Sequence, residues 1–105
     1  MPTVLDEHLV AESLTALTDW SGSRSGIRRT VSLPVGQIEE LLSEVAAAAD
    51  SMNHHPKVDR SGGATTFILW THSEGGVTKL DFDLAGRIDE LVRKVSADLP
   101  PAERG

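Results

Sequence analysis

The residues from Val35 to Met52 carry the strongest periodic pattern in the chain, and this pattern limits what the chain can fold into. Apolar side chains recur there at three- and four-residue steps, which places them on one face of a helix: Ile38, Leu41, Leu42, Val45, Ala49 and Met52. Pro56 disfavours the helical conformation at His55, so the helix must end by His55. The apolar face of this helix must be covered by a second layer of structure, which the rest of the chain has to supply.

Two further segments show the helical period, one on each side of this central helix. Residues 6–17 form the first, and Asp6 is expected to cap its N-terminus. Ahead of the second, Thr78 and Asp81 have the spacing of a capping box. Apolar positions follow at helical steps: Leu84, Ile88, Leu91, Val92, Val95 and Leu99.

The segments between the helices have the patterns of antiparallel strands. Residues 27–33 alternate between apolar and polar side chains, although Arg29 interrupts the apolar face. Residues 57–60 and 64–72 flank a Ser-Gly-Gly turn, which is typical of a hairpin. If Trp20 and its neighbours form the first strand, the element order is α-β-β-α-β-β-α. We therefore predict an α+β fold, a four-stranded antiparallel sheet with three helices on one face.

The length of the chain and its shortage of aromatic residues set the expected organisation. The 105 residues fit one domain, which we place at residues 1–99, followed by a disordered tail at residues 100–105. Aromatic residues make up only 4% of the chain, so the core is small. A small core favours subunits that share apolar surface, and we expect a homodimer or a homotetramer.

The charge balance and the cysteine count exclude several classes of function. The 16 acidic residues outnumber the 10 basic ones, giving a net charge of −6, which argues against direct binding to nucleic acid or to an anionic membrane. The absence of cysteine excludes disulfides, thiolate metal sites and a cysteine nucleophile. No stretch approaches the roughly 18 apolar residues of a membrane helix, and the first residues do not resemble a secretory signal. We expect a cytoplasmic protein.

Three histidines fall where the predicted elements end. His54 and His55 close the long helix, and His72 closes the strand that follows it. Asp50 precedes His54 by four residues, so the two side chains can meet on one helical face, where the carboxylate and the helix end both favour a protonated imidazole. His72 lies shortly before the helix N-terminus at Thr78, which disfavours positive charge. Two imidazoles that differ in charge can perform acid–base chemistry near neutral pH.

Two other interpretations of these residues remain. His54 and His55 are equally well explained as favourable neighbours of the last helical carbonyl groups. A metal site built from Asp50, His54, His55 and His72 fits poorly, because adjacent residues on a helix point about 100° apart.

Four pieces of the sequence form a pattern that is specific when they are taken together: Asp50-Ser51-Met52-Asn53-His54-His55-Pro56, Thr71-His72, Gly75-Gly76-Val77-Thr78 and Asp81. His72 lies 17 positions after His55, and Asp81 lies nine positions after His72. This pattern resembles that of the pterin-4a-carbinolamine dehydratase family, also called 4a-hydroxytetrahydrobiopterin dehydratases. Weaker similarity covers nearly the whole chain.

The resemblance implies an enzyme that removes water from a 4a-hydroxy-tetrahydropterin and yields a quinonoid dihydropterin. Aromatic amino-acid hydroxylases leave this substrate, so such a hydroxylase would be the pathway partner. The reaction would need one proton donor and one proton acceptor, and neither a cofactor nor a metal. The resemblance makes His54, His55 and His72 the catalytic residues. His54 and His72 would be the acid–base pair, and His55 would bind and orient the pterin.

Further matched positions imply contacts around the substrate. Asp50 would hold a histidine in its reactive charge state. The other implied substrate-binding residues, for which backbone groups would supply many of the contacts, are Pro56, Thr71, Ser73, Glu74 and Asp81. For Asp81, helix capping is at least as good an explanation.

The hairpin after Pro56 departs from the family pattern. Members of the family commonly carry aromatic residues there, whereas residues 57–63 contain none, so binding to the pterin ring could be weakened. Trp70 could supply compensating surface, although strand packing explains it more simply. The alternative function is a non-catalytic binding module, an assembly factor or a dimerisation cofactor. The three histidines favour catalysis, and the missing aromatic residues favour the module.

Overall fold

Four antiparallel strands form one sheet in the computed structural model, which describes residues 3–97 and 99. The strands are β1 (Ser21–Ser23), β2 (Gly26–Val31), β3 (Lys57–Ser61) and β4 (Ala64–Leu69). Their order across the sheet is β1-β2-β4-β3, so two hairpins meet where β2 pairs with β4. The helices are α1 (Glu7–Leu14), α2 (Val35–Met52) and α3 (Lys79–Ser96), with a short 3-10 helix, η1 (His72–Glu74), before α3.

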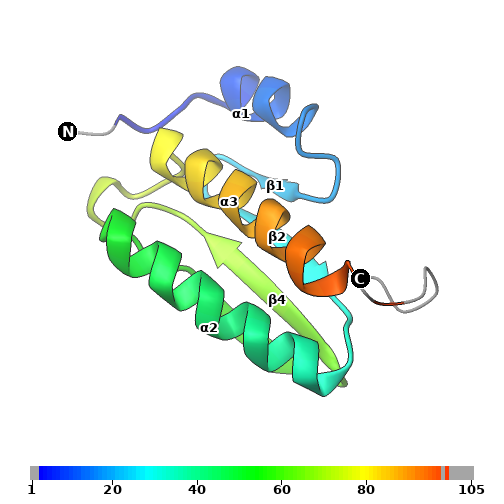
Figure 1. The fold of residues 1–105 in the computed structure, drawn as a ribbon. Helices are drawn as coiled ribbons and strands as arrows, with labels where there is room; N and C mark the ends of the chain where they lie inside the picture. The colour runs from blue at the N-terminus through cyan, green and yellow to red at the C-terminus, as the bar shows by residue number, and fades with distance from the viewer. Residues whose placement is uncertain (1–2, 98, 100–105) are drawn as a thin grey trace.

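The helices lie on one side of this sheet, with α2 and α3 next to each other and α1 near β1 (Figure 1). The predicted element order and the α+β class are confirmed. The predicted bounds of the central helix agree with α2, because its apolar period and the following turn both mark its extent.

Some predicted elements end earlier than the sequence pattern indicates. The second strand ends at Val31, not at residue 33. The first helix ends at Leu14, not at residue 17. The fourth strand ends at Leu69, not at residue 72, because the Thr71 carbonyl accepts hydrogen bonds from the N–H groups of Glu74 and Gly75 and turns the chain. As a result His72 begins η1 and does not close a strand.

The core lies between the sheet and the helices. From the sheet, Ile27, Phe67 and Leu69 are at most 1% exposed, and from α2 and α3, Leu41 and Leu84 are fully buried. Burying a side chain of this size stabilises a fold by about 1.5–3 kcal/mol. The pattern in β4 alternates between buried and half-buried residues, as expected for a sheet covered on one face.

Arg29, which interrupts the apolar pattern of β2, is buried and paired. Its Nη1 donates to Asp89 Oδ1 on α3 at 2.6 Å, and Trp20 Nε1 donates to the same oxygen at 2.8 Å. Asp19 Oδ2 lies 3.6 Å from Arg29 Nη2. The cluster of Trp20, Arg29 and Asp89 joins the start of the sheet to α3 through a buried ion pair and a buried hydrogen bond.

The predicted tail, residues 100–105, lies outside the described residues, and the domain boundary at residue 99 stays a prediction. Within the part of the chain that the structure describes, none of the helices has the length and apolar character needed to cross a membrane.

Candidate active site

A left-handed turn at Asn53 directs the two histidines that follow α2. Asn53 has a φ of 51°, its N–H donates to the Asp50 carbonyl at 3.1 Å, and the His54 N–H donates to the Ala49 carbonyl at 3.0 Å. These two hydrogen bonds make a Schellman motif. Asparagine is one of the few residues other than glycine that visit the left-handed region routinely. The chain therefore leaves the helix before His54, and His54 and His55 directly follow the helix end, as predicted.

The predicted contact between Asp50 and His54 is wrong, because the four-residue spacing brings side chains together only within a helix. Asp50 Oδ1 instead lies 2.7 Å from His55 Nε2. The His54 ring faces α3, and its Nε2 lies 2.6 Å from Asp81 Oδ1.

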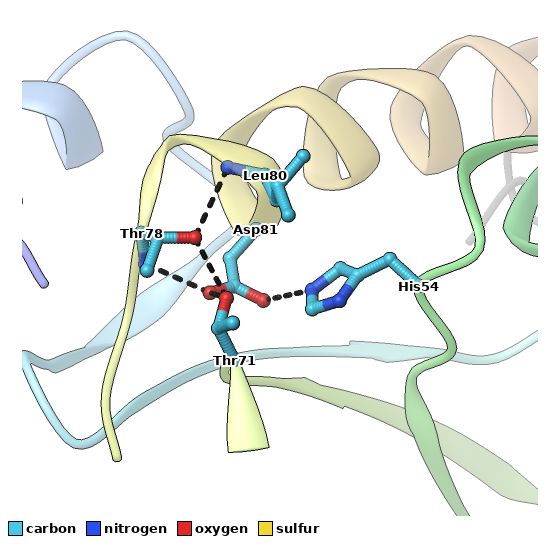
Figure 2. A network of polar contacts seen from close by, with 5 residues as sticks. All are labelled: His54, Thr71, Thr78, Leu80 and Asp81. Carbon is cyan, nitrogen blue, oxygen red and sulfur yellow. Dashed lines mark hydrogen bonds and ion pairs between the residues drawn. The ribbon is translucent and has the colours of Figure 1, made fainter. Parts of the chain in front are cut away.

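Asp81 is completely buried and holds the centre of a polar network (Figure 2). Its Oδ2 accepts hydrogen bonds from the Thr78 N–H at 2.9 Å and from the Thr71 hydroxyl at 2.8 Å. The two threonine hydroxyl groups are 2.7 Å apart, and Thr78 Oγ1 also accepts from the Leu80 N–H at 3.2 Å. The predicted capping box of Thr78 and Asp81 is present. The same carboxylate therefore caps α3 and holds His54.

His55 lies on the surface, apart from this network. Its side chain is 57% exposed and that of Asp50 is 75% exposed, so water competes with their ion pair. His55, Pro56 and Val58 line a groove of about 150 Å³ beside α2, whose other lining residues are Leu42, Val45, Ala46 and Ala49. One side of His55 thus faces apolar surface.

The loop that carries His72 directly follows Thr71, which is a member of the polar network. Thr71 is buried and forms an isolated bridge with Gly76, and the chain turns back through a left-handed Gly75 with a φ of 74°. His72 and Ser73 are exposed at the outside of this turn. The His72 ring lies 6.4 Å from the Trp70 ring, measured between centroids.

The structure joins some of the predicted site residues and separates others. Thr71, Asp81 and His54 share one network, and the backbone of His72 adjoins it because His72 follows Thr71. Asp50 and His55 form a separate surface pair. Among residues 3–97 and 99, no three His, Asp or Glu side chains come together as ligands for a metal ion.

The sequence pattern did not identify Asn53 as a residue that shapes the site, and it identified only part of the role of Thr78. Asn53 redirects the chain, and the signal that could have identified it is an asparagine directly after the helical pattern. Thr78 was expected only as a cap, whereas its hydroxyl also contacts Thr71.

The fold and site together define a small α+β protein that places histidines directly after its central helix and in the short 3-10 helix that follows its fourth strand. Over residues 3–91 the sequence matches the family described as pterin 4 alpha carbinolamine dehydratase. The chain belongs to this family, and the family name designates a dehydratase, a hydro-lyase. The resemblance found in the sequence is therefore confirmed.

Individual relatives agree with this assignment. A protein of Nocardia farcinica (strain IFM 10152), whose name assigns it provisionally as a pterin-4-alpha-carbinolamine dehydratase, is 43% identical over 86% of this chain and 96% of its own. A protein of Roseiflexus sp. (strain RS-1) with the same name is 38% identical over 88% of this chain and 100% of its own. A crystal structure described as a transcriptional coactivator/pterin dehydratase from Brucella melitensis has a TM-score of 0.78 and 29% identity, covering 83% of this chain and 96% of that one.

Proposed function

We propose that this protein dehydrates a 4a-hydroxy-tetrahydropterin to a quinonoid dihydropterin and water. In this reaction the C4a–O bond breaks and the oxygen takes up a proton to leave as water. N5 loses its proton, and the electron pair of its N–H bond forms the C4a=N5 double bond. One proton donor and one proton acceptor are therefore sufficient.

The observation that carries the proposal is the pair of His54 and buried Asp81 beside the loop of His72, in a chain that belongs to this family. We propose His54 and His72 as the acid–base pair, one held from inside the protein and one exposed to solvent. His55 would bind and orient the pterin, with Asp50 as its carboxylate partner. Pro56, Ser73 and Glu74 would complete the substrate contacts.

The direct test is a kinetic assay on the purified protein. A 4a-carbinolamine is generated in situ from a tetrahydropterin, and its loss is followed by ultraviolet absorbance. We expect a rate above the uncatalysed blank, because positioned acid–base groups typically contribute about 10²–10⁴-fold. His54→Ala and His72→Ala should each reduce the rate by about 100-fold, whereas His8→Ala, an exposed histidine on α1, should not. A folded protein that only matches the blank would refute the enzymatic proposal.

A second candidate function is a partner-binding module. Two observations favour it: the Brucella melitensis protein is named as a transcriptional coactivator as well as a dehydratase, and residues 57–63 of this chain, which form β3 and the turn before β4, contain no aromatic residue. A folded protein without dehydratase activity would favour this candidate.

The expected assembly, partner and location remain proposals as well. Within residues 3–97 and 99, edge strands β1 and β3 each have one side that pairs with no other strand, which supports association into a homodimer or homotetramer. Light scattering that shows a monomer would contradict this. An aromatic amino-acid hydroxylase is the pathway partner that would supply the substrate, and the acidic, cysteine-free composition supports a cytoplasmic location.

A further inference from the structure

We propose that Thr71 and Thr78 are positioning residues that fix the His54 ring with its proton on Nε2 and its lone pair on Nδ1, which makes His54 the proton acceptor of the reaction. The part of this inference that concerns the reaction rests on the proposed function. Thr71 would then act through Asp81 and His54, and its side chain would not bind the substrate.

The direction of each hydrogen bond follows from counting the hydrogens in the network. A hydroxyl group has one hydrogen, and that of Thr71 is donated to Asp81 Oδ2. In the 2.7 Å contact between the two hydroxyl groups, Thr78 must therefore be the donor. Thr78 Oγ1 in turn accepts from the Leu80 N–H. The donors thus run in one direction, from Leu80 through Thr78 and Thr71 to the carboxylate (Figure 2).

The hydrogen bonds of the Asp81 carboxylate determine which nitrogen of the His54 ring carries a hydrogen. Asp81 Oδ2 already accepts from a hydroxyl and from the Thr78 N–H, which can only donate. Asp81 Oδ1 needs a donor of its own, because the side chain has no exposed surface through which water could supply one. The one group within hydrogen-bond distance of Oδ1 among the described residues is His54 Nε2, at 2.6 Å. Nε2 therefore carries a hydrogen.

A neutral imidazole with its hydrogen on Nε2 has its lone pair on Nδ1. Within the described part of the chain, His54 Nδ1 has no hydrogen-bond partner, and it is not among the fully buried polar atoms that lack one. Solvent therefore reaches it, although the side chain as a whole is only 11% exposed. Figure 2 shows this second ring nitrogen directed away from Asp81. In this neutral form, the atom that His54 presents outward is a proton acceptor.

This arrangement assigns a direction to the proposed reaction, and it is the reverse of the one that the sequence pattern favours, in which His54 is protonated and His72 is neutral. The N5 proton moves to His54 Nδ1, and the electron pair left at N5 forms the double bond to C4a. The C4a–O electron pair leaves with the oxygen, which takes a proton from the protonated His72 imidazole and departs as water. Afterwards His54 is protonated and His72 is neutral, and exchange with solvent restores both. Both side chains of the His55–Asp50 pair are exposed to solvent, so Asp50 does not fix the orientation of the His55 ring as Asp81 fixes that of His54.

Nitrogen NMR of the full-length protein tests the hydrogen position directly, since protonated and unprotonated ring nitrogens have distinct shifts. For neutral His54 we expect Nε2 to be protonated and Nδ1 to be unprotonated. Thr71→Val removes the hydroxyl at nearly constant size and with it one of the two hydrogen bonds that hold Asp81 Oδ2, so the carboxylate should be free to turn and the two ring forms should be mixed. Thr71→Ser should restore the wild-type form. A wild-type protein with the hydrogen on Nδ1 would overturn the proposal, whatever the variants do.

Kinetics tests the consequence for the reaction. In metal sites, the outer hydrogen-bond partners of ligand histidines are typically worth roughly 10–100-fold in metal affinity or activity, and we use the same range for the partners of His54. We therefore expect Thr71→Val to lower kcat by roughly this factor with KM within about twofold, and Thr71→Ser to restore kcat. The matched control is Thr66→Val, which removes a hydroxyl of the same strand region from a 2.8 Å contact with Thr30, away from Asp81.

The possible outcomes separate the two proposals. Equal kcat values for Thr71→Val and Thr66→Val would overturn the positioning role. A rise in KM alone would also overturn it, because that result indicates direct substrate binding by Thr71. If the wild-type protein were inactive, the proposed function and the role of His54 as acceptor would both fail. The NMR result would then still decide whether the threonines orient His54.

Discussion

The buried cluster of Trp20, Arg29 and Asp89 offers the sharpest test of how this fold is held together. The two charged side chains are 9% and 12% exposed, and Asp89 Oδ1 accepts hydrogen bonds from both Arg29 and Trp20. Asp89→Ala would leave the buried guanidinium without its nearest carboxylate and the indole N–H without its acceptor. Removing one member of a buried ion pair typically costs about 3–5 kcal/mol.

Two details set where in that range the loss should fall. Among the residues that the structure describes, Arg29 Nε is buried without a hydrogen-bond partner, so part of the cost of burying this side chain is present in the wild-type protein. Asp19, which is 66% exposed, lies 3.6 Å from Arg29 and can compensate for part of the lost charge. We therefore expect a loss near the lower end, about 3 kcal/mol. The free energy of unfolding of a domain is commonly about 5–15 kcal/mol, so this is a large share.

Urea unfolding followed by far-ultraviolet circular dichroism measures the loss. With an m value of about 2 kcal/mol per M, a loss of 3 kcal/mol lowers the midpoint by about 1.5 M. The double variant Arg29→Met with Asp89→Leu removes both charges and should recover most of the stability. The control is Glu44→Ala, which breaks the exposed ion pair with Lys94 and should cost less than about 1 kcal/mol. An Asp89→Ala variant as stable as the Glu44→Ala control would refute this reasoning.

Two other substitutions test the turns that frame the site. Asn53→Ala should lower the free energy of unfolding by about 1 kcal/mol, because alanine is strained in the left-handed conformation, whereas Asn53→Gly should not. Thermal unfolding distinguishes them, and equal melting temperatures for the two variants would contradict the role given to Asn53. Thr78→Ala should cost about 1–2 kcal/mol through loss of the helix cap, with Thr78→Ser close to wild type. In the same thermal assay, a Thr78→Ala variant as stable as Thr78→Ser would mean that the hydroxyl does not stabilise α3.

Much of the fold could be predicted because its elements depend on local patterns. The apolar period of α2 and the glycine turn between β3 and β4 act over a few residues each, and both match the structure. The end of β4 could not be predicted in this way. It is determined by a bridge between Thr71 and Gly76 and by the turn inside it, which no alternation of side chains encodes.

The site was harder to predict because one residue changes which side chains can meet. In a continuous helix, Asp50 and His54 would share a face, and Asp81 would serve only as a cap. The left-handed conformation of Asn53 exchanges the partners: His55 turns back to Asp50, and His54 reaches Asp81 on a helix that begins 25 residues later in the chain, at Lys79. The His54–Asp81 pair is almost completely buried, whereas Asp50, the partner that the sequence predicts for His54, is 75% exposed. A proton acceptor whose ring must keep one orientation needs the first kind of environment, since an exposed ion pair does not hold its geometry against water. The turn at Asn53 therefore contributes to the chemistry of His54 as well as to the end of the helix.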